Sequence, residues 1–290
     1  MDWLQPRLRR FPVLRIRGDV TCIGDIWHNY YHRYVDLLPK VHALHAASLQ
    51  DRKIALILTA HFRRDDVRIL EALLPPNVTI RSLPRYVRIV VDRYVHLPRL
   101  STNPDKPCRN DSSIGFLPDS YLQWYRQRVF DVLNVHTPAA DRRRHLYISR
   151  SKARKRRIYN ESELTAILSD YDFEVIHLED LTLRDQVALF SEAAVVVAQH
   201  GAALTNILYA SPGSALIELV SSTTGQEIHY SLGAVNLGMR YYRIPLETVD
   251  GRKDTDGMVD VEGMRATLDE AMRRKEPGRG LPIGVDQASA

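Results

Sequence analysis

The chain has 290 residues, 44% of them apolar, which suffices for one large domain or two ordinary ones and excludes collagen-like, low-complexity and wholly disordered proteins. Its formal net charge of +5 is unevenly placed, because residues 141–160 carry a net +8 and residues 161–250 carry a net −10. This distribution argues against a uniformly basic surface for nucleic acid and favours a local anion site on an otherwise acidic domain.

The first half of the sequence predicts helices and strands of uneven regularity. Apolar periodicity and turn residues indicate a long helix at residues 29–48, a buried strand at 54–58, a helix at 67–74, strands at 78–80 and 87–91, and a helix at 121–133. Residues 99–118 are rich in proline and show no periodicity, which indicates a long surface loop.

The second half is more regular. Apolar strands are predicted at residues 145–149, 174–178, 194–198, 215–220 and 241–244, and helices at 183–193, 203–209 and 227–236, with another that begins near Asn160 and has Glu163 as its capping-box partner. Apolar strands that alternate with helices are typical of a parallel sheet covered on both faces. The fold class is therefore α/β, and we expect two Rossmann-like domains, at residues 1–137 and 138–275, with a flexible tail at 276–290.

The number of cysteines and the N-terminal sequence bear on the cellular compartment in which the protein is expected. Cys22 and Cys108 are the two cysteines and give no disulfide framework, so a reducing environment is expected. The N-terminus lacks the apolar core of a signal peptide, and no apolar run approaches the roughly 18 residues that a membrane-spanning helix needs. We therefore expect a soluble, cytoplasmic protein.

A basic segment, residues 142–157, begins before the predicted strand at 145–149 and continues beyond it. Open α/β sheets bind ligands at the carboxyl ends of their strands. Ser149 and Arg150 stand at that end and Arg156 follows, and the planar fork of arginine suits two adjacent phosphate oxygens. A solvated basic loop is the alternative, but the position at the strand end favours a phosphate site.

A glycine turn follows the predicted strand at 194–198. There the sequence His200-Gly201-Ala202-Ala203 leads into a helix with small first residues, so backbone N–H groups could approach an anion closely. Taken alone, His200 is more simply a hydrogen-bonded histidine at a strand end. Beside an arginine-rich loop from a neighbouring strand, a diphosphate site becomes a competitive interpretation.

A histidine and an aspartate share one face of the helix predicted at 29–48. His32 and Asp36 are four residues apart, and a carboxylate one turn away can orient an imidazole and raise its basicity, as a general base requires. The alternative is a surface ion pair on an amphipathic helix. Nearby aromatic residues, Trp27, Tyr30, Tyr31 and Tyr34, favour a sugar-binding surface or a core.

Motifs for metal and cofactor chemistry are weak. Asp254-Thr255-Asp256 matches the D-x-D pattern of many metal-dependent nucleotide-sugar enzymes, but it lies in a turn-rich stretch. The sequence has no H-E-x-x-H spacing, no cysteine set for zinc, no G-x-S-x-G elbow and no Walker loop. We therefore expect neither a metal nor a cofactor.

Together, these features resemble the glycosyltransferase family 61 group (DUF563-type transferases), over roughly residues 20–245. The resemblance rests on three stretches: Asn29-Tyr30-Tyr31-His32 with Asp36 and Pro39; Tyr147-Ile148-Ser149-Arg150 with Arg156, Asn160 and Glu161; and His200-Gly201-Ala202-Ala203-Leu204-Thr205-Asn206 with Pro212-Gly213-Ser214 and Glu218-Leu219.

The resemblance implies a GT-B architecture, in which two Rossmann-like domains face each other across a cleft, and an inverting hexosyl or pentosyl transfer from a nucleotide sugar. The expected donor is a UDP-sugar. By this resemblance the C-terminal domain binds the donor through Ser149, Arg150, Arg156, His200, Gly201, Asn206 and Glu218. The arginines would contact the diphosphate and Glu218 the ribose hydroxyls, without a metal.

On the acceptor side, the resemblance implies a base in the N-terminal domain, and it leaves His32 and Asp36 both open. The expected acceptor is a glycan or a lipid-linked glycan, with peripheral association at the inner face of the cell membrane, and the oligomeric state stays open. Arg33 stands where the family often has an aromatic residue, which is expected to alter acceptor binding.

Two functions other than glycosyl transfer are possible interpretations of the sequence. A non-catalytic nucleic-acid-binding protein would use residues 142–157, but the acidity of residues 161–250 counts against it. A nucleotide-dependent oxidoreductase or methyltransferase would need a glycine-rich first turn, which the sequence lacks.

Overall fold

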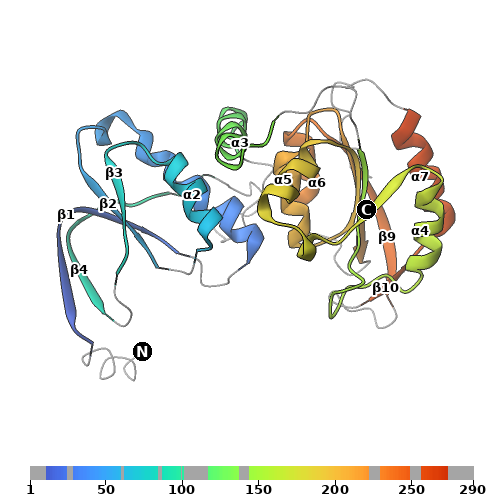
Figure 1. The fold of residues 1–290 in the computed structure, drawn as a ribbon, viewed down its shortest axis with the longest axis horizontal. Helices are drawn as coiled ribbons and strands as arrows, with labels where there is room; N and C mark the ends of the chain where they lie inside the picture. Colours follow the sequence, from blue (N-terminus) through green and yellow to red (C-terminus); the bar gives the residue numbers. More distant parts are fainter. Residues whose placement is uncertain are drawn as a thin grey trace, which may run out of the picture. The chain divides into compact units, whose positions relative to one another are not determined.

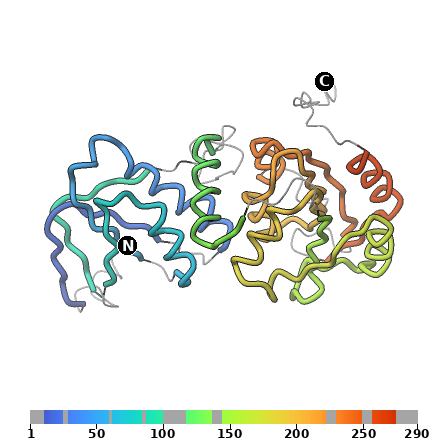
Figure 2. The backbone as a smooth tube through the Cα atoms, turned by 45° about the horizontal axis from the view of Figure 1, so that its top comes forward, coloured from blue at the N-terminus to red at the C-terminus, as the bar shows by residue number. Residues whose placement is uncertain are grey.

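A computed structural model describes residues 11–24, 29–59, 62–83, 87–98, 100, 117–136, 144–221, 229–248 and 256–273 of the chain. The chain divides into two compact units, residues 1–136 (unit 1) and 137–290 (unit 2). Each unit has its own β-sheet, and the two sheets share no strand (Figure 1), while Figure 2 traces the backbone of each unit. An α/β fold with parallel sheets is thus confirmed, whereas a GT-B pair facing across a cleft stays a prediction.

Unit 1 contains a four-stranded parallel sheet in the order β3-β2-β1-β4. Its strands are β1 (Val13–Ile23), β2 (Ile54–Leu58), β3 (Val78–Arg81) and β4 (Arg88–Tyr94). The three strands predicted in this half are confirmed as β2, β3 and β4. The central strand, β1, was not predicted, because Arg15, Arg17 and Asp19 interrupt its apolar residues.

The helix predicted at residues 29–48 is present but is not an α-helix through most of its length. It consists of a π-helical turn, η1 (His32–Leu37), and two 3₁₀ segments, η2 (Leu38–His45) and η3 (Ala47–Leu49). The Leu38 N–H donates to the Arg33 carbonyl five residues earlier, and Pro39 in the next turn has no N–H to donate. Such π-turns are rare and occur frequently at functional sites.

Two α-helices complete unit 1 and contact each other, α2 (Arg64–Leu73) and α3 (Asp119–Leu133). The Arg63 N–H donates to Asp66 at the start of α2, and the Arg68 guanidinium donates to the Val132 carbonyl near the end of α3. Helix α3 ends at Asn134 in the left-handed conformation, which asparagine tolerates better than most residues.

Unit 2 contains a six-stranded sheet in the order β10-β9-β8-β7-β5-β6, parallel except for β10 against β9. Its strands are β5 (Arg144–Ile148), β6 (Phe173–Ile176), β7 (Ala193–Gln199), β8 (Ala215–Ser221), β9 (Arg240–Thr248) and β10 (Gly257–Val259). The five parallel strands have the 2-1-3-4-5 order of a doubly wound fold, in which the chain reverses direction across the sheet between β5 and β7.

Helices cover both faces of this sheet (Figure 1). On one face lie α4 (Glu161–Ser169) and α7 (Val261–Arg273), and on the other lie α5 (Leu183–Ser191), α6 (His229–Asn236) and the 3₁₀ helix η6 (Ala202–Tyr209). A short 3₁₀ turn, η5 (Leu178–Asp180), connects β6 to α5. The helices predicted at 183–193 and 227–236 are confirmed as α5 and α6.

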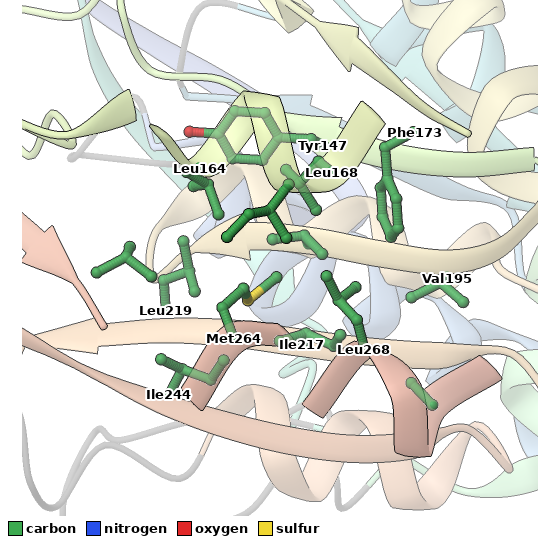
Figure 3. Packing of buried hydrophobic residues seen from close by; sticks show 14 of the residues in the cluster. Tyr147, Leu164, Leu168, Phe173, Val195, Ile217, Leu219, Ile244, Met264 and Leu268 are labelled. Atoms are coloured by element: carbon green, nitrogen blue, oxygen red, sulfur yellow. The ribbon is translucent and has the colours of Figure 1, made fainter. Parts of the chain in front are cut away.

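The core between the sheet and the α4–α7 face is apolar and closely packed. Leu164 from α4 and Met264 and Leu268 from α7 are fully buried against strand residues such as Ile217 (Figure 3). Truncating a buried leucine in such a core to alanine typically costs about 2–5 kcal/mol. This packing fixes the sheet whose strand ends carry the predicted site.

Unit 2 differs from the prediction in four respects. The sequence does not predict strand β10 and helix α7, and β10 begins directly after Asp256 of the turn-rich stretch. Asn160 precedes α4 without a side-chain cap, because its amide bonds the backbone N–H and carbonyl of Val259 on β10 instead. The helix expected at 203–209 has 3₁₀ geometry.

Several predicted features lie outside the described residues: most of the loop at 99–118, most of the segment at 136–143 around the expected domain boundary, Trp27, Asp254 and the tail at 276–290. Among the helices that the structure describes, none is both long enough and apolar enough to cross a bilayer. The boundary near residue 138 and the division of donor and acceptor between the units stay predictions.

Candidate functional site

Two arginines converge on one glycine where the strand order of unit 2 reverses. A Cβ atom added to Gly201 would lie 3.6 Å from the Nη1 atoms of both Arg150 and Arg156. Arg150 follows the end of β5 and Gly201 follows the end of the adjacent strand β7. Ligands of open α/β sheets bind at this switch point. The structure therefore brings together three residues that the sequence predicted.

The loop that carries these arginines is held by its own hydrogen bonds. The Arg150 guanidinium donates to the carbonyls of Lys155 and Arg156, at 3.3 and 3.1 Å, and Arg156 Nη1 donates to the His200 carbonyl at 3.3 Å. Arg156 has a φ of 61°, in the left-handed region, which costs an L-residue about 1–2 kcal/mol. Strained residues of this kind cluster at ligand sites.

The electrostatics of the pair suit an anion. Burial, with the positive charge of Arg156 beside it, lowers the pKa of Arg150, although the group stays charged. An anion between the two guanidiniums would relieve their repulsion and could accept bidentate hydrogen bonds from both. The first turn of η6 adds backbone N–H groups that have no intrahelical acceptor.

His200 lies in a buried hydrogen-bonded chain with Glu218 and Tyr241. The His200 Nδ1 atom is 2.5 Å from Glu218 Oε1, and the Tyr241 hydroxyl donates to Glu218 Oε2 at 2.8 Å. Glu218 is only 1% exposed. Burial, then the nearby Glu218 charge, raises the pKa of Tyr241, so this hydroxyl stays a donor. Glu218 thus orients the His200 ring, and its contact with a ribose stays a prediction.

Ser149 lies next to Arg150, but its hydroxyl is used within the protein. Ser149 Oγ donates to Glu161 Oε1 at 2.6 Å, and the Tyr147 hydroxyl donates to the same oxygen at 2.8 Å. Ser149 Oγ also accepts from the Ser151 N–H. Glu161 at the start of α4 therefore fixes the turn that presents Arg150. A direct contact between Ser149 and a donor stays a prediction.

Asn206 is placed differently from the other predicted donor residues. It is buried in η6, and its amide donates to Gln186 on α5 and to the Ala203 carbonyl, each at 3.2 Å. These bonds hold η6 against α5. The structure thus gives Asn206 a place in the packing of η6 against α5, and a contact between Asn206 and a donor stays a prediction.

In unit 1, His32 and Asp36 form a hydrogen-bonded pair on the π-turn η1. His32 Nδ1 lies 2.7 Å from Asp36 Oδ2, and the histidine side chain is 39% exposed whereas the aspartate side chain is 5% exposed. The geometry of an oriented imidazole is therefore present. Tyr30, just before η1, and Tyr34, within η1, lie with ring centroids 4.5 Å apart.

Arg33, which departs from the family pattern, is buried in an ion pair. Its Nη1 lies 2.5 Å from Asp66 Oδ2, and the Tyr34 hydroxyl donates to the other oxygen of Asp66. The Arg33 guanidinium also lies over the Phe62 ring, 5.6 Å from its centroid. Arg33 therefore ties η1 to the start of α2, and the expected effect on acceptor binding is untested.

Three of the nine cations in the basic segment are paired with carboxylates within unit 2. Arg144 pairs with Glu174 and Glu192, Lys152 with Asp180, and Arg157 with Asp256. Burial opposes ionisation of Asp256, but hydrogen bonds from Arg157 outweigh it and lower the pKa of this carboxyl. These pairs leave fewer cations for a phosphate backbone, which argues against the nucleic-acid hypothesis.

Asp256 is the one residue of the D-x-D pattern within the described residues, and it holds Arg157. Across the described ranges, no group of three or more histidine, cysteine, aspartate or glutamate side chains could hold a metal ion.

Sequence reasoning missed Glu161 and Tyr241 as supporting residues. Glu161 was noted as part of the family resemblance but without a role, and Tyr241 was assigned only to a strand. Their partners lie 12 and 23 positions away, so only the tertiary fold identifies these contacts.

A model of the glycosyltransferase 61 family matches residues 30–217, which is more than half of the chain. The chain belongs to the glycosyltransferase 61 family. This confirms the resemblance inferred from the three sequence features. The matched range includes His32, the arginine loop and the glycine turn, and it ends one residue before Glu218.

Two individual proteins are similar to this chain over very different shares of its length. A beta-1,2-xylosyltransferase of Arabidopsis thaliana is 33% identical over 69 residues, which cover 24% of this chain and 13% of the plant protein. Among solved structures, the dodecameric iron-containing heptosyltransferase TibC, in complex with ADP-D-beta-D-heptose, aligns with a TM-score of 0.35 and 11% identity, covering 72% of this chain and 59% of that one. At that TM-score the alignment carries no argument.

Proposed function

We propose that this member of the glycosyltransferase 61 family is an inverting glycosyltransferase that moves a hexosyl or pentosyl group from a UDP-sugar to a hydroxyl of a glycan or lipid-linked glycan. One observation carries the proposal: Arg150 and Arg156 both point at Gly201 where the strand order of unit 2 reverses. A diphosphate is the part of a sugar nucleotide that fits two guanidiniums and a helix start.

The arginines would act on the leaving group. As the bond between the anomeric carbon and the phosphate oxygen breaks, negative charge grows on the diphosphate, and fixed guanidiniums stabilise that charge without reorganisation. Removing one such preorganised donor typically costs about 10²–10³ in kcat. Because the His200 carbonyl accepts from Arg156, the Glu218–His200 pair would also hold Arg156 in place.

The base would come from unit 1. The acceptor oxygen attacks the anomeric carbon from the face opposite the diphosphate, the new C–O bond forms as the old one breaks, and the hydroxyl proton passes to the base. His32 fits this role because its ring is the more exposed member of the pair, and Asp36 would orient it. A cytoplasmic location and peripheral membrane association stay predictions.

Thermal unfolding with nucleotides tests the proposal. At a ligand concentration of 100 Kd, binding stabilises a protein by about 2.7 kcal/mol, which corresponds to roughly 5–10 °C for a unit of this size. We expect UDP to raise Tm by this order in the natural protein, and Arg150→Ala to abolish the rise. Arg154→Ala is the matched control, because Arg154 is exposed in the same loop. No shift with any nucleoside diphosphate would contradict the proposal.

A further inference from the structure

A charged cavity of about 630 Å³ lies in unit 1 where β2 and β3 begin. Four cationic side chains line it, together with two carboxylates, Asp19 and Asp51; the cations are Arg17, Arg52, Lys53 and Arg81. Because the strands are parallel, this edge of the sheet is opposite the edge from which β1 leads on to His32. The cavity and His32 therefore belong to opposite edges of the unit 1 sheet, so the cavity is separate from the proposed base.

A buried aspartate positions the guanidinium of Arg52. Asp19 has a side chain that is 4% exposed, and it accepts from Arg52 Nε at 2.7 Å and from Arg93 Nε at 2.5 Å. These two hydrogen bonds hold the pKa of Asp19 well below its usual range, and the bond from Arg52 has the larger effect. Both bonds use only Nε. Within the described part of the chain, the terminal amino groups of Arg52 and Arg93 have no hydrogen-bond partner.

The loop that carries Arg52 is also fixed. The Asn77 amide donates to the carbonyls of Leu49 and Arg52, each at 2.8 Å, and the Asn77 carbonyl accepts from the Ile54 N–H at 3.0 Å. Gly18 lines the same cavity with a φ of +89°, at a bulge in β1, and no described atom lies within 4 Å of the position of its missing Cβ. The cavity thus has a rigid cationic wall and an open backbone position.

We infer that this cavity binds a phosphate group, held by the terminal amino groups of Arg52 and by Arg81 and Lys53. Phosphate fits because a guanidinium fixed through Nε still presents two parallel N–H donors to adjacent oxygens, and because cations exceed carboxylates in the lining. The group can come from a soluble phosphate compound or from a phospholipid headgroup. The inference does not depend on the donor proposal.

Isothermal titration with pyrophosphate tests the site, since pyrophosphate should bind here and at the donor arginines. We expect the natural protein to bind two equivalents, Arg150→Ala to lose one and Arg52→Gln with Arg81→Gln to lose the other. Arg128→Gln on α3 removes one positive charge, as each of these two substitutions does, at an exposed position of the same unit and should keep both. If only the donor proposal is wrong, the natural protein should bind one equivalent of pyrophosphate, which Arg150→Ala does not change and the Arg52→Gln Arg81→Gln variant loses.

Arg81→Gln alone guards against a folding defect, because Arg81 is exposed and does not bond Asp19. It should weaken pyrophosphate at this site about tenfold, the loss expected for one charge-assisted contact. Sedimentation with phosphatidylcholine vesicles, with and without phosphatidylglycerol, distinguishes the sources. Binding to the anionic vesicles that the double variant loses identifies a headgroup, and binding of pyrophosphate alone identifies a soluble ligand. If the double variant matches Arg128→Gln in both assays, the inference is wrong.

Discussion

Glu161 supports the donor loop through two buried hydroxyls, and its removal should be costly. The hydroxyls of Tyr147 and Ser149 both donate to Glu161 Oε1, and both residues are at most 3% exposed. Glu161→Ala leaves the two without this acceptor. A buried polar group without its partner costs about 1–3 kcal/mol, and the Ser149 hydroxyl can still donate to Ser151 Oγ, so the free energy of unfolding should fall by about 1–3 kcal/mol.

Glu161→Gln is the matched control, because a glutamine keeps a carbonyl oxygen that can accept from both hydroxyls. It should cost about 1 kcal/mol or less, chiefly through the lost negative charge in the first turn of α4. Urea denaturation of the two variants at pH 7 measures the difference. If alanine and glutamine destabilise equally, or if alanine costs less than about 1 kcal/mol, Glu161 does not hold the loop as described.

Further outcomes follow from buried and paired groups elsewhere. Burial, and to a lesser extent an adjacent glutamate, raises the pKa of Tyr147 and of Tyr241. The stability that these hydroxyls contribute is therefore present below the pKa of an unfolded tyrosine, about 10, and is lost as the pH rises further. The urea concentration at the unfolding midpoint should decrease once the pH exceeds about 10. Asp66→Ala removes the carboxylate that pairs with the buried Arg33 and should lower the free energy of unfolding by about 3–5 kcal/mol in the same assay; a loss under 1 kcal/mol would contradict the buried ion pair. His32→Ala should lower kcat at least about 100-fold with donor saturating, and Asp36→Asn less, because the first removes the base and the second its orienting partner; the reverse order would assign the base to Asp36.

The sequence predicts the strands of the two sheets best where apolar residues run without interruption. Strands β2 and β8 are such runs, and both were found at the predicted positions. The sequence does not predict strand β1 because charged residues interrupt its apolar ones. Pairing makes these charges tolerable in a strand, as Asp19 shows with its two arginines. Helix α7 carries a readable signal, since its buried residues Met264, Leu268 and Ala271 recur at helical spacing.

The site was predictable in part for a physical reason. Parallel strands bring their carboxyl ends to one edge, so Arg150 after one strand and Gly201 after another could be expected to meet. The roles of Glu161 and Tyr241 could not be read from spacing, because they depend on which buried hydroxyl reaches which carboxylate oxygen across different elements.

The central claim is that Arg150 and Arg156 together bind the diphosphate of a nucleotide sugar. Calorimetric titration of UDP and UMP against the natural protein, the Arg150→Ala Arg156→Ala variant and the Arg154→Ala control tests it most directly, because the two nucleotides differ by one phosphate. We expect UDP to bind at least about tenfold more tightly than UMP to the natural protein and to the control, a difference of about 1.4 kcal/mol, and this ratio to fall toward one in the double variant. An unchanged ratio in the double variant would contradict the account.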